Sequence, residues 1–293
     1  MQETLLFKLD KYTNSYLNEK KSLKYSINTI STYSGILEEF FEYMVKYEDK
    51  ILLEEISKDI VLEFIHSNDK HSNTTKQLRL TVIKALFKYI DTFNDKYDFE
   101  HKIKKLNIKT QRKELESLTT YEVDRLLELF CKKSNSFNFN RDKLLVYILL
   151  YTGIRASELL NLKFDDIEEV EDMYRLLILG KGNKQRYEYI LKDKIQNEIE
   201  FLKQYSTSLI ALTNKNKPMS RVGLYNVISN KMKKANINKK GVHILRHTFA
   251  KTLVAKNVNL STIKDLLGHE NISTTMIYAK SNEDNKIGAV RLL

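Results

Sequence analysis

Residues 141–162 read RDKLLVYILLYTGIRASELLNL and determine the architecture of the second half of the chain. An apolar run of helical length ends at Gly153, and a second helical pattern follows directly. We therefore predict a buried helix, a tight turn at the glycine and a second helix. Arg155 and Glu158 stand three residues apart, so both project from one face of the second helix, where a surface ion pair is the simplest interpretation.

The segments on either side of this helical pair predict an α+β domain. Upstream, Thr119 and Glu122 in SLTTYEVDRLLELF have the spacing of a capping box, which indicates the start of a helix. Downstream, residues 173–191 read MYRLLILGKGNKQRYEYIL and alternate between apolar and polar residues. They predict two strands with Lys181 at the tip of the hairpin. Helical patterns return from residue 194 onward.

The first 105 residues predict a bundle of four or five helices. Helical patterns cover residues 3–20, 28–47, a stretch from Ser57, and 74–93. The last of these is expected to bury one face made of Leu78, Val82, Ala85, Leu86 and Tyr89. The strongly charged residues 106–116 are predicted to be a linker, and residues 117–293 the second domain. The fold class is therefore mainly α with a small β-sheet.

The composition excludes several classes of protein. Cys131 is the single cysteine, which excludes an internal disulfide and any zinc site with several cysteines. No apolar run is long enough to cross a bilayer, and the N-terminal residues carry acids and no small-residue cleavage site. We therefore predict neither a membrane anchor nor a signal peptide, and we expect a protein of the reducing cytoplasm.

The formal net charge is +11, and its distribution is informative. Residues 201–264 contain 13 lysines and arginines and no aspartate or glutamate. A field of one sign is typical of a protein that binds a polyanion, although a solvated helical surface is the alternative. The candidate phosphate contacts are Lys239 and Lys240 in this stretch and Lys76, Arg79 and Lys84 in the first domain.

Six residues of the second domain have side chains suited to phosphodiester chemistry. Arginine donates two parallel hydrogen bonds to a phosphate that gains charge in the transition state. A proton donor must serve the leaving 5′-oxygen, and a hydroxyl nucleophile must lose its own proton. The candidates in chain order are Arg155, Lys181, His243, Arg246, His269 and Tyr278.

Each candidate has a simpler interpretation when it is considered alone. Lys181 is an ordinary exposed turn residue, and the spacing of a phosphate-binding P-loop is absent. His243 and His247 have a spacing that would suit a metal, but the acid-free stretch offers no carboxylate to join them. We therefore predict no metal site and a structural role for His247. Tyr278 is one of 17 tyrosines, and only its place nine residues after His269 distinguishes it.

Taken together, the motifs TGIRASELL, GKGNKQR, HILRHTFA and LGHENISTTMIYAK resemble those of the tyrosine recombinase, or phage integrase, family. The two-domain layout is most similar to the Xer-type recombinases. The resemblance covers residues 115–293 with specific motifs and the first domain more weakly. It implies a C-shaped clamp on double-stranded DNA, with a core-binding (SAM-like) bundle in residues 1–105 and a catalytic domain in residues 117–293.

The resemblance also implies a role for each candidate. Tyr278 would attack the scissile phosphate to give a 3′-phosphotyrosyl link and a free 5′-hydroxyl. Arg155 and Arg246 would hold the non-bridging oxygens, and His269 would add a hydrogen bond. Lys181 would be the general acid for the 5′-oxygen.

Two further residues and the partners follow from the same resemblance. His243 would accept or share the tyrosine proton, and Glu158 would support the site, although the residues alone do not divide the work between His243 and His269. No metal and no other cofactor is implied. The implied assembly is a homo- or hetero-tetramer on two DNA sites, with an activating DNA translocase as a candidate partner.

Alternative functions stay open within and outside this class. The expected role is Xer-type resolution of chromosome or plasmid dimers, and the alternative is integration and excision of a mobile element. A type IB topoisomerase uses similar chemistry. The alternative from another class is a catalytically silent DNA-binding relative.

The C-terminal residues 281–293, SNEDNKIGAVRLL, are more apolar than a free terminus requires. The apolar side chains are Ile287, Ala289, Val290, Leu292 and Leu293. We expect this tail to dock, either into a neighbouring protomer of the tetramer or onto its own domain.

Overall fold

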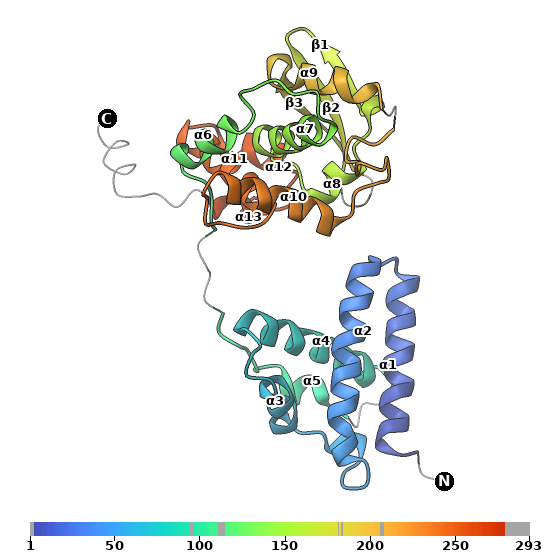
Figure 1. Ribbon diagram of the computed structural model, residues 1–293. Helices are drawn as coiled ribbons and strands as arrows, with labels where there is room; N and C mark the ends of the chain where they lie inside the picture. The colour runs from blue at the N-terminus through green and yellow to red at the C-terminus, as the bar shows by residue number, and fades with distance from the viewer. Residues whose placement is uncertain are drawn as a thin grey trace, which may run out of the picture. The chain divides into compact units, whose positions relative to one another are not determined.

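The computed structural model describes residues 3–93, 97–110, 115–180, 182, 184–205 and 208–278. The chain forms two compact units, residues 1–113 and 114–293 (Figure 1). Helices make up most of both units, and the one sheet of the described residues has three strands. The prediction of a mainly α fold with a small β-sheet is confirmed.

The first unit is a helical bundle. Its helices are α1 (Leu5–Ser22), α2 (Ile27–Met44), α3 (Lys58–His66), α4 (Asn73–Asp91) and α5 (Phe99–Ile103), with 3-10 turns at Val45–Tyr47 and Leu53–Glu55. The first four helices begin after a hydroxyl residue whose side chain accepts a hydrogen bond from a backbone N–H of the first turn. Such caps satisfy donors that the helix itself leaves unpaired.

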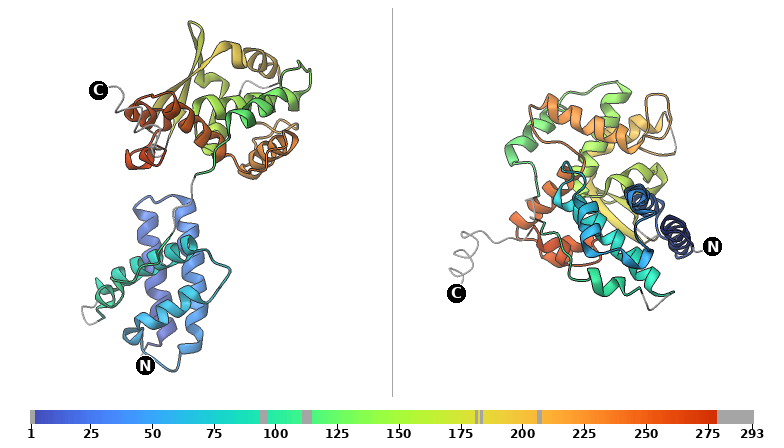
Figure 2. Two further views of the ribbon diagram at one scale, coloured as in Figure 1. Left: turned by 90° about the vertical axis from the view of Figure 1, so that its left-hand side faces the viewer. Right: turned by 90° about the horizontal axis from the view of Figure 1, so that it is seen from below.

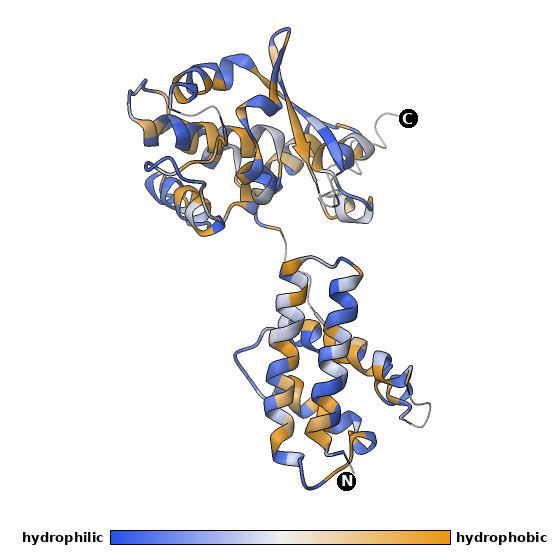
Figure 3. Cartoon of the chain, turned by 90° about the vertical axis from the view of Figure 1, so that its right-hand side faces the viewer, coloured by the Kyte–Doolittle hydropathy of each residue, from blue (hydrophilic) through white to orange (hydrophobic). Residues whose placement is uncertain are grey.

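Hydrophobic and hydrophilic residues alternate along the helices of this unit, as Figure 3 shows for α1 and α2. In α4 the prediction for Leu78 was wrong, because this side chain is 42% exposed. Val82 and Leu86 are buried as predicted. The buried side of the helix also contains Leu80, Ile83, Phe87 and Ile90, whose spacing of three and four residues brings four more large side chains into the core. Of the residues expected in the linker, Leu106 and Ile108 pack against this core.

The second unit contains eight α-helices and three strands in its described residues. The helices are α6 (Thr120–Glu128), α7 (Phe137–Thr152), α8 (Ala156–Asn161), α9 (Lys192–Lys203), α10 (Arg221–Lys234), α11 (His243–Ala255), α12 (Leu260–Leu267) and α13 (Ser273–Met276), with a 3-10 turn at Phe164–Asp166. The predicted capping box is present: Thr119 N–H donates to Glu122, whose own N–H donates to the Thr119 hydroxyl.

The sheet is antiparallel with strand order β1-β2-β3. The predicted hairpin is formed by β2 (Met173–Leu179) and β3 (Gln185–Leu191), whereas the short, charged β1 (Ile167–Val170) gave no pattern that predicted a strand. Alternation along β2 and β3 buries one face of the hairpin. Glu188 also lies on this buried face, although the other buried residues of the hairpin are hydrophobic.

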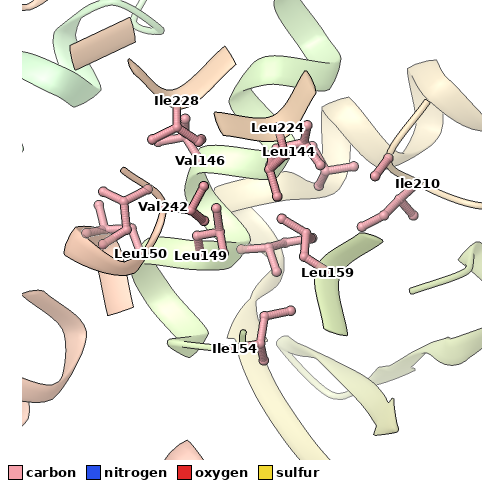
Figure 4. Close-up of a cluster of buried hydrophobic side chains, with 14 of the residues drawn as sticks. Leu144, Val146, Leu149, Leu150, Ile154, Leu159, Ile210, Leu224, Ile228 and Val242 are labelled. Atoms are coloured by element: carbon pink, nitrogen blue, oxygen red, sulfur yellow. The ribbon is translucent and has the colours of Figure 1, made fainter. Parts of the chain in front are cut away.

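Helix α7 passes through the middle of the second unit. The sheet and α9 lie on one side of it and α10 on the other (Figures 1 and 2). Leu144, Leu149 and other side chains of α7 meet residues from α8 and α10 in one buried cluster (Figure 4). Because the apolar residues of 141–152 face several partners at once, this helix is apolar on nearly all sides.

The turn after α7 is the one that residues 141–162 predict. Gly153 ends the helix with φ +64°, a left-handed conformation that favours glycine. A side chain at this position would also collide with the neighbouring helix, since an added Cβ would lie 2.3 Å from Phe249 Cδ1. The glycine therefore fixes where α8 starts.

No helix of the described segments combines the length and the apolar character that crossing a membrane requires.

Two alanine substitutions at glycine should have opposite effects on stability. Gly153→Ala should lower the free energy of unfolding of the second unit by at least about 2 kcal/mol, because it adds backbone strain and a steric clash. Gly35→Ala should raise that of the first unit by about 0.5–1 kcal/mol, because Gly35 lies inside α2 with no atom within 4 Å of the added Cβ. Urea denaturation of the two variants measures both, and a stable Gly153→Ala protein would contradict the role of the turn.

Candidate active site

The N-terminus of α8 forms an ion pair from the predicted Arg155 and Glu158. Arg155 is the N-cap residue, and its backbone N–H donates to Glu158 Oε2 at 2.7 Å. Its Nη1 donates to Glu158 Oε1 at 2.9 Å. Glu158 thus caps the helix and holds the guanidinium of Arg155, whose side chain is 36% exposed.

A second arginine, Arg186 on β3, binds the same carboxylate from the opposite side. Its Nη1 and Nη2 donate to Glu158 Oε1 and Oε2 at 2.9 and 2.8 Å. Burial raises the pKa of Glu158, but hydrogen bonds from Arg186 and from the Arg155 backbone outweigh it and lower the pKa to about 2. Glu158 is therefore a fixed negative charge between two guanidinium groups.

Three successive carbonyl groups at the C-terminal end of α12 accept hydrogen bonds from three arginines. The last carbonyls of a helix have no partner within it and form its negative end. Segments far apart in the sequence meet here. The contacts are Arg186 Nε with Leu266 O (3.4 Å), Arg246 Nη2 with Leu267 O (2.7 Å) and Arg155 Nη2 with Gly268 O (2.9 Å).

Arg246 is the most deeply buried of these arginines, with 5% of its surface exposed. Its Nη1 donates to Gly153 O at 2.7 Å, so the turn after α7 also orients this side chain. Burial and the nearby charge of Arg155 lower the pKa of Arg246 to about 10, which leaves it positively charged in neutral solution.

His269 follows Gly268, which ends α12 in the left-handed conformation with φ +59°. Its Nε2 accepts a hydrogen bond from Arg246 Nη2 at 2.9 Å, so the proton of the neutral ring is on Nδ1, which donates to Thr275 Oγ1 at 2.9 Å. Burial and the charges of Arg246 and Arg155 lower the pKa of His269 to about 4. The ring is neutral at neutral pH.

Tyr278 lies two residues beyond α13 and is only 7% exposed. Its hydroxyl lies 2.8 Å from His247 Nδ1, where either group can donate. Burial raises the pKa of this phenol, so the hydroxyl holds its proton. The structural role predicted for His247 was therefore incomplete, because His247 and not His243 contacts the Tyr278 hydroxyl.

His243 is exposed at the first turn of α11, and its ring centroid lies 6.4 Å from that of His247. Although the residue as a whole is exposed, part of its ring packs against the protein, and this partial burial, together with the charges of Arg246, Arg221 and Arg155, lowers its pKa.

Arg155 lies at the border of two hollows in the surface of the second unit. One of about 560 Å³ is also lined by His243, Arg221, Tyr225 and Lys240. The other, of about 820 Å³, is also lined by His269, Arg186, Lys184 and Lys264. Arg155 is the residue that both hollows share, while buried Arg246 lines neither of them.

Two DNA-contact candidates of the first unit, Arg79 and Lys84, bind other groups of the same unit. Arg79 is 3% exposed and pairs with Glu39, so it is a buried ion-pair partner and not an available phosphate contact. Lys84 donates to the carbonyls of Lys104 and Leu106 at 2.9 and 2.6 Å, which ties down the segment after α5.

The three remaining basic candidates differ in whether another side chain pairs with them. Lys76 is partly buried, and its Nζ lies 3.4 Å from His66 Nδ1. Lys239 pairs with Glu122 and donates to a backbone carbonyl, whereas Lys240 is exposed beside the first hollow. Acids from outside residues 201–264 thus neutralise part of the acid-free stretch. Lys240 lines the same hollow as Arg155 and His243.

The remaining predictions of the sequence fall on other parts of the chain. Lys181 lies outside the described residues, as does the C-terminal tail from residue 279. Among the described residues, no group of three or more histidine, cysteine, aspartate or glutamate side chains has the geometry of a metal site.

The site as a whole can bind and polarise an anion. It presents Arg155, buried Arg246 and a neutral imidazole at one turn of the chain, and Glu158 holds the exposed guanidinium in place. Fixed donors of this kind stabilise charge that develops on a phosphate oxygen, because they need no reorganisation during the reaction. A tyrosine hydroxyl follows within ten residues of that turn.

Weak signals in the sequence accompany the site residues that were not predicted. Arg186 and Glu188 occupy alternate positions of a predicted strand, so one face of that strand carries both charges. His247 is one helical turn beyond His243, which places the two rings on one face. None of these signals specifies a partner from another segment.

Comparison with known proteins supports the same interpretation. The model of the phage integrase family matches residues 116–285. The chain is 29% identical to tyrosine recombinase XerH of Campylobacter jejuni, covering 90% of this chain and 78% of the relative, and 31% identical to a tyrosine recombinase of Thermosipho africanus, covering 92% and 94%. A crystal structure of XerH bound to difH substrate in a pre-cleavage complex superposes with a TM-score of 0.74 and 26% identity, covering 94% of this chain and 83% of that one.

Buried Glu188 should make the stability of the second unit depend on pH. Burial raises its pKa from 4.5 to about 8, against the opposing effect of Arg186. Between these values the folded protein binds a proton that the unfolded chain releases, so the free energy of unfolding should fall as the pH rises through this window. Glu188→Gln keeps the shape without the titration and should remove this fall.

Urea denaturation of the wild type and Glu188→Gln between about pH 5 and about pH 9 measures the effect. The same substitution at the exposed Glu128 of α6 controls for the loss of one carboxylate. An unchanged difference in stability between wild type and Glu188→Gln across that range would contradict the raised pKa.

Proposed function

The chain belongs to the phage integrase family, and we propose that it cuts and rejoins DNA strands through a covalent bond to Tyr278. It is a site-specific DNA recombinase of the Xer type, and DNA is its partner. The roles of individual residues, the assembly and the biological task are the parts that we propose.

The observation that carries the proposed site is the meeting of Arg155, Arg246 and His269 at one turn. The Arg246 guanidinium lies 2.9 Å from His269 Nε2, and Arg155 binds the carbonyl of the residue before His269. The two arginines would hold the non-bridging oxygens of the scissile phosphate. His269 would add a hydrogen bond once its Nε2, which here accepts from Arg246, carries the ring proton. Removing one such donor typically costs about 10²–10³-fold in rate.

The proposed reaction conserves the energy of the DNA backbone. The Tyr278 oxygen attacks phosphorus, the bond from phosphorus to the 5′-oxygen breaks, and a 3′-phosphotyrosyl link forms. The 5′-oxygen leaves as a hydroxyl with a proton from Lys181. Rejoining is the reverse attack by a 5′-hydroxyl, so the exchange consumes no nucleotide, and no metal or other cofactor takes part.

The Tyr278 proton passes to a histidine of α11 in this proposal. His247 is its hydrogen-bond partner in the structure, and His243 is one helical turn away. The depressed pKa of both imidazoles favours their neutral forms, which can accept a proton. Because Tyr278 is 7% exposed, its side chain must turn outward before attack.

The proposed biological task is resolution of chromosome or plasmid dimers in the cytoplasm. The Xer-type relatives support it, and integration and excision of a mobile element is the alternative. In either task residues 1–105 would form the core-binding half and residues 117–293 the catalytic half of a C-shaped clamp around the DNA. A DNA translocase is a candidate activator.

Covalent trapping tests the proposed nucleophile. On a nicked suicide substrate that carries the target site, the wild type in EDTA without ATP should form a protein–DNA adduct that resists denaturant. Tyr278→Phe should form none, because the phenyl ring lacks the attacking oxygen. Tyr121→Phe, at a 69% exposed tyrosine on α6, is the matched control and should form the adduct as the wild type does.

An adduct with Tyr278→Phe would show that another residue attacks. Wild-type binding to the target without any adduct would favour the catalytically silent DNA-binding alternative. Relaxation of supercoiled DNA by a monomer without site preference would favour a type IB topoisomerase.

We also propose that the enzyme works as a tetramer on two DNA sites, linked by docking of the C-terminal tail into a neighbouring protomer. The apolar composition of residues 287–293 supports this proposal. Burial of several aliphatic side chains would contribute about 1.5–3 kcal/mol for each one fully buried. The partner protomers are identical copies or a second recombinase.

Deleting residues 284–293 should abolish synapsis and strand exchange while leaving binding to a single site within about threefold, because the deletion removes a contact between protomers. Native gel analysis of paired sites and a recombination assay measure both. The double substitution Glu283→Gln and Asp284→Asn keeps the apolar residues and should retain synapsis. Normal strand exchange by the deletion variant would contradict docking in trans.

A further inference from the structure

Arg186 is a charged residue of the site that has no role in the proposed reaction. It lies on β3, and its side chain is 15% exposed against 36% for Arg155. Each of its three nitrogen atoms donates to a glutamate side chain: two bind Glu158, and Nε donates to Glu188 Oε1 at 2.9 Å. Each nitrogen atom of the guanidinium group therefore already donates a hydrogen bond within the protein.

The same side chain also supports the turn between α12 and His269. A Cβ added to Gly268 would lie 3.0 Å from both Arg186 Cζ and Nη1, so the guanidinium packs directly against this glycine. Gly268 O in turn accepts the hydrogen bond from Arg155 Nη2. Arg186 therefore contacts both groups that hold the guanidinium of Arg155, namely the Glu158 carboxylate and the Gly268 peptide.

We propose that Arg186 is a positioning residue that fixes Arg155 at the scissile phosphate through Glu158. The Gly268 turn is its second point of contact, and Glu188 orients it. This inference rests on the proposed function and assigns a task to residues of the same site. Its physical basis is that Arg155 is a partly exposed side chain that would otherwise lose rotamer entropy when it binds the phosphate.

Glu188 can orient the Arg186 side chain because it is buried on β3 and its carboxyl group is mostly protonated at neutral pH. Its raised pKa, caused by burial and opposed by Arg186, keeps a proton on the carboxyl at neutral pH. A protonated carboxyl still accepts a hydrogen bond from Arg186 Nε through its carbonyl oxygen. It does not compete as a full anion with Glu158 for the other two nitrogen atoms.

A positioning role and a direct phosphate contact predict different kinetics. If Arg186 acts through Arg155, its loss matters only while Arg155 is present to be positioned, and the two effects do not multiply. If Arg186 touches the phosphate itself, each substitution removes a separate interaction, and the fold-changes multiply. A double-mutant cycle in single-turnover cleavage separates the two cases.

The cycle uses the full-length protein and the suicide substrate at saturating protein concentration. Arg186→Gln should slow cleavage by about 10–100-fold, the cost of a small misplacement, with target binding within about threefold of the wild type. Arg155→Lys should slow cleavage by about 10²–10³-fold. The Arg155→Lys, Arg186→Gln double variant should be no more than about threefold slower than Arg155→Lys.

Two variants separate positioning from simple loss of structure. Glu188→Gln keeps an acceptor for Arg186 Nε and should cleave within about threefold of the wild type, whereas Glu188→Ala should slow cleavage about tenfold. The Glu188→Ala defect should also vanish in the Arg155→Lys background. Thermal denaturation shows whether Arg186→Gln is folded. If it is not, the double-mutant cycle of Glu188→Ala and Arg155→Lys tests the same proposal.

Two results would overturn the proposal: wild-type cleavage by a folded Arg186→Gln protein, or fold-changes that multiply in both cycles. Both presuppose that the wild type cleaves the substrate. Absence of any adduct with the wild type on a site that it binds would instead contradict the proposed function, so the two failures are distinguishable.

Discussion

The C-terminal end of α12 is the point on which the rest of the site depends. Three successive carbonyls there bind three guanidinium groups, from the start of α8, from β3 and from α11. Three positive charges in one partly buried space repel each other, so the arrangement requires a compensating anion. Glu158 supplies it with both carboxylate oxygens, and its strongly lowered pKa reports how firmly the charge is held.

This arrangement determines the electrostatic character of the neighbouring groups. Burial and the surrounding positive charge keep His269 and His247 neutral, so each ring retains a nitrogen that can accept a hydrogen bond or a proton. Arg246 stays charged although it is buried, because two backbone carbonyls and an imidazole accept its hydrogen bonds. The Tyr278 hydroxyl is paired to His247. The two guanidinium groups of Arg155 and Arg246 are thus already oriented in the free protein, whereas the Tyr278 side chain is only 7% exposed.

Local features of the fold were predictable where a single segment specifies its own geometry. The turn at Gly153, the capping box at Thr119 and the hairpin of β2 and β3 each follow from residues only a few positions apart. Leu78 was placed on the wrong face because several overlapping sets of apolar residues fit a helical period, and packing against the other helices selects among them. For the same reason Arg79 looked available in the sequence and is buried beside Glu39 in the bundle.

The sequence by itself determined the chemistry of the second unit: which side chains are present, in which order, and next to which turns. From its motifs we predicted that Arg155, Arg246, His269 and Tyr278 take part in one reaction. Only the tertiary structure decided which of these groups touch, that Arg186 shares Glu158 with Arg155, and that His247 holds the tyrosine. These are contacts between residues tens of positions apart, and their geometry depends on how α8, β3, α11 and α12 pack, which no short-range pattern encodes.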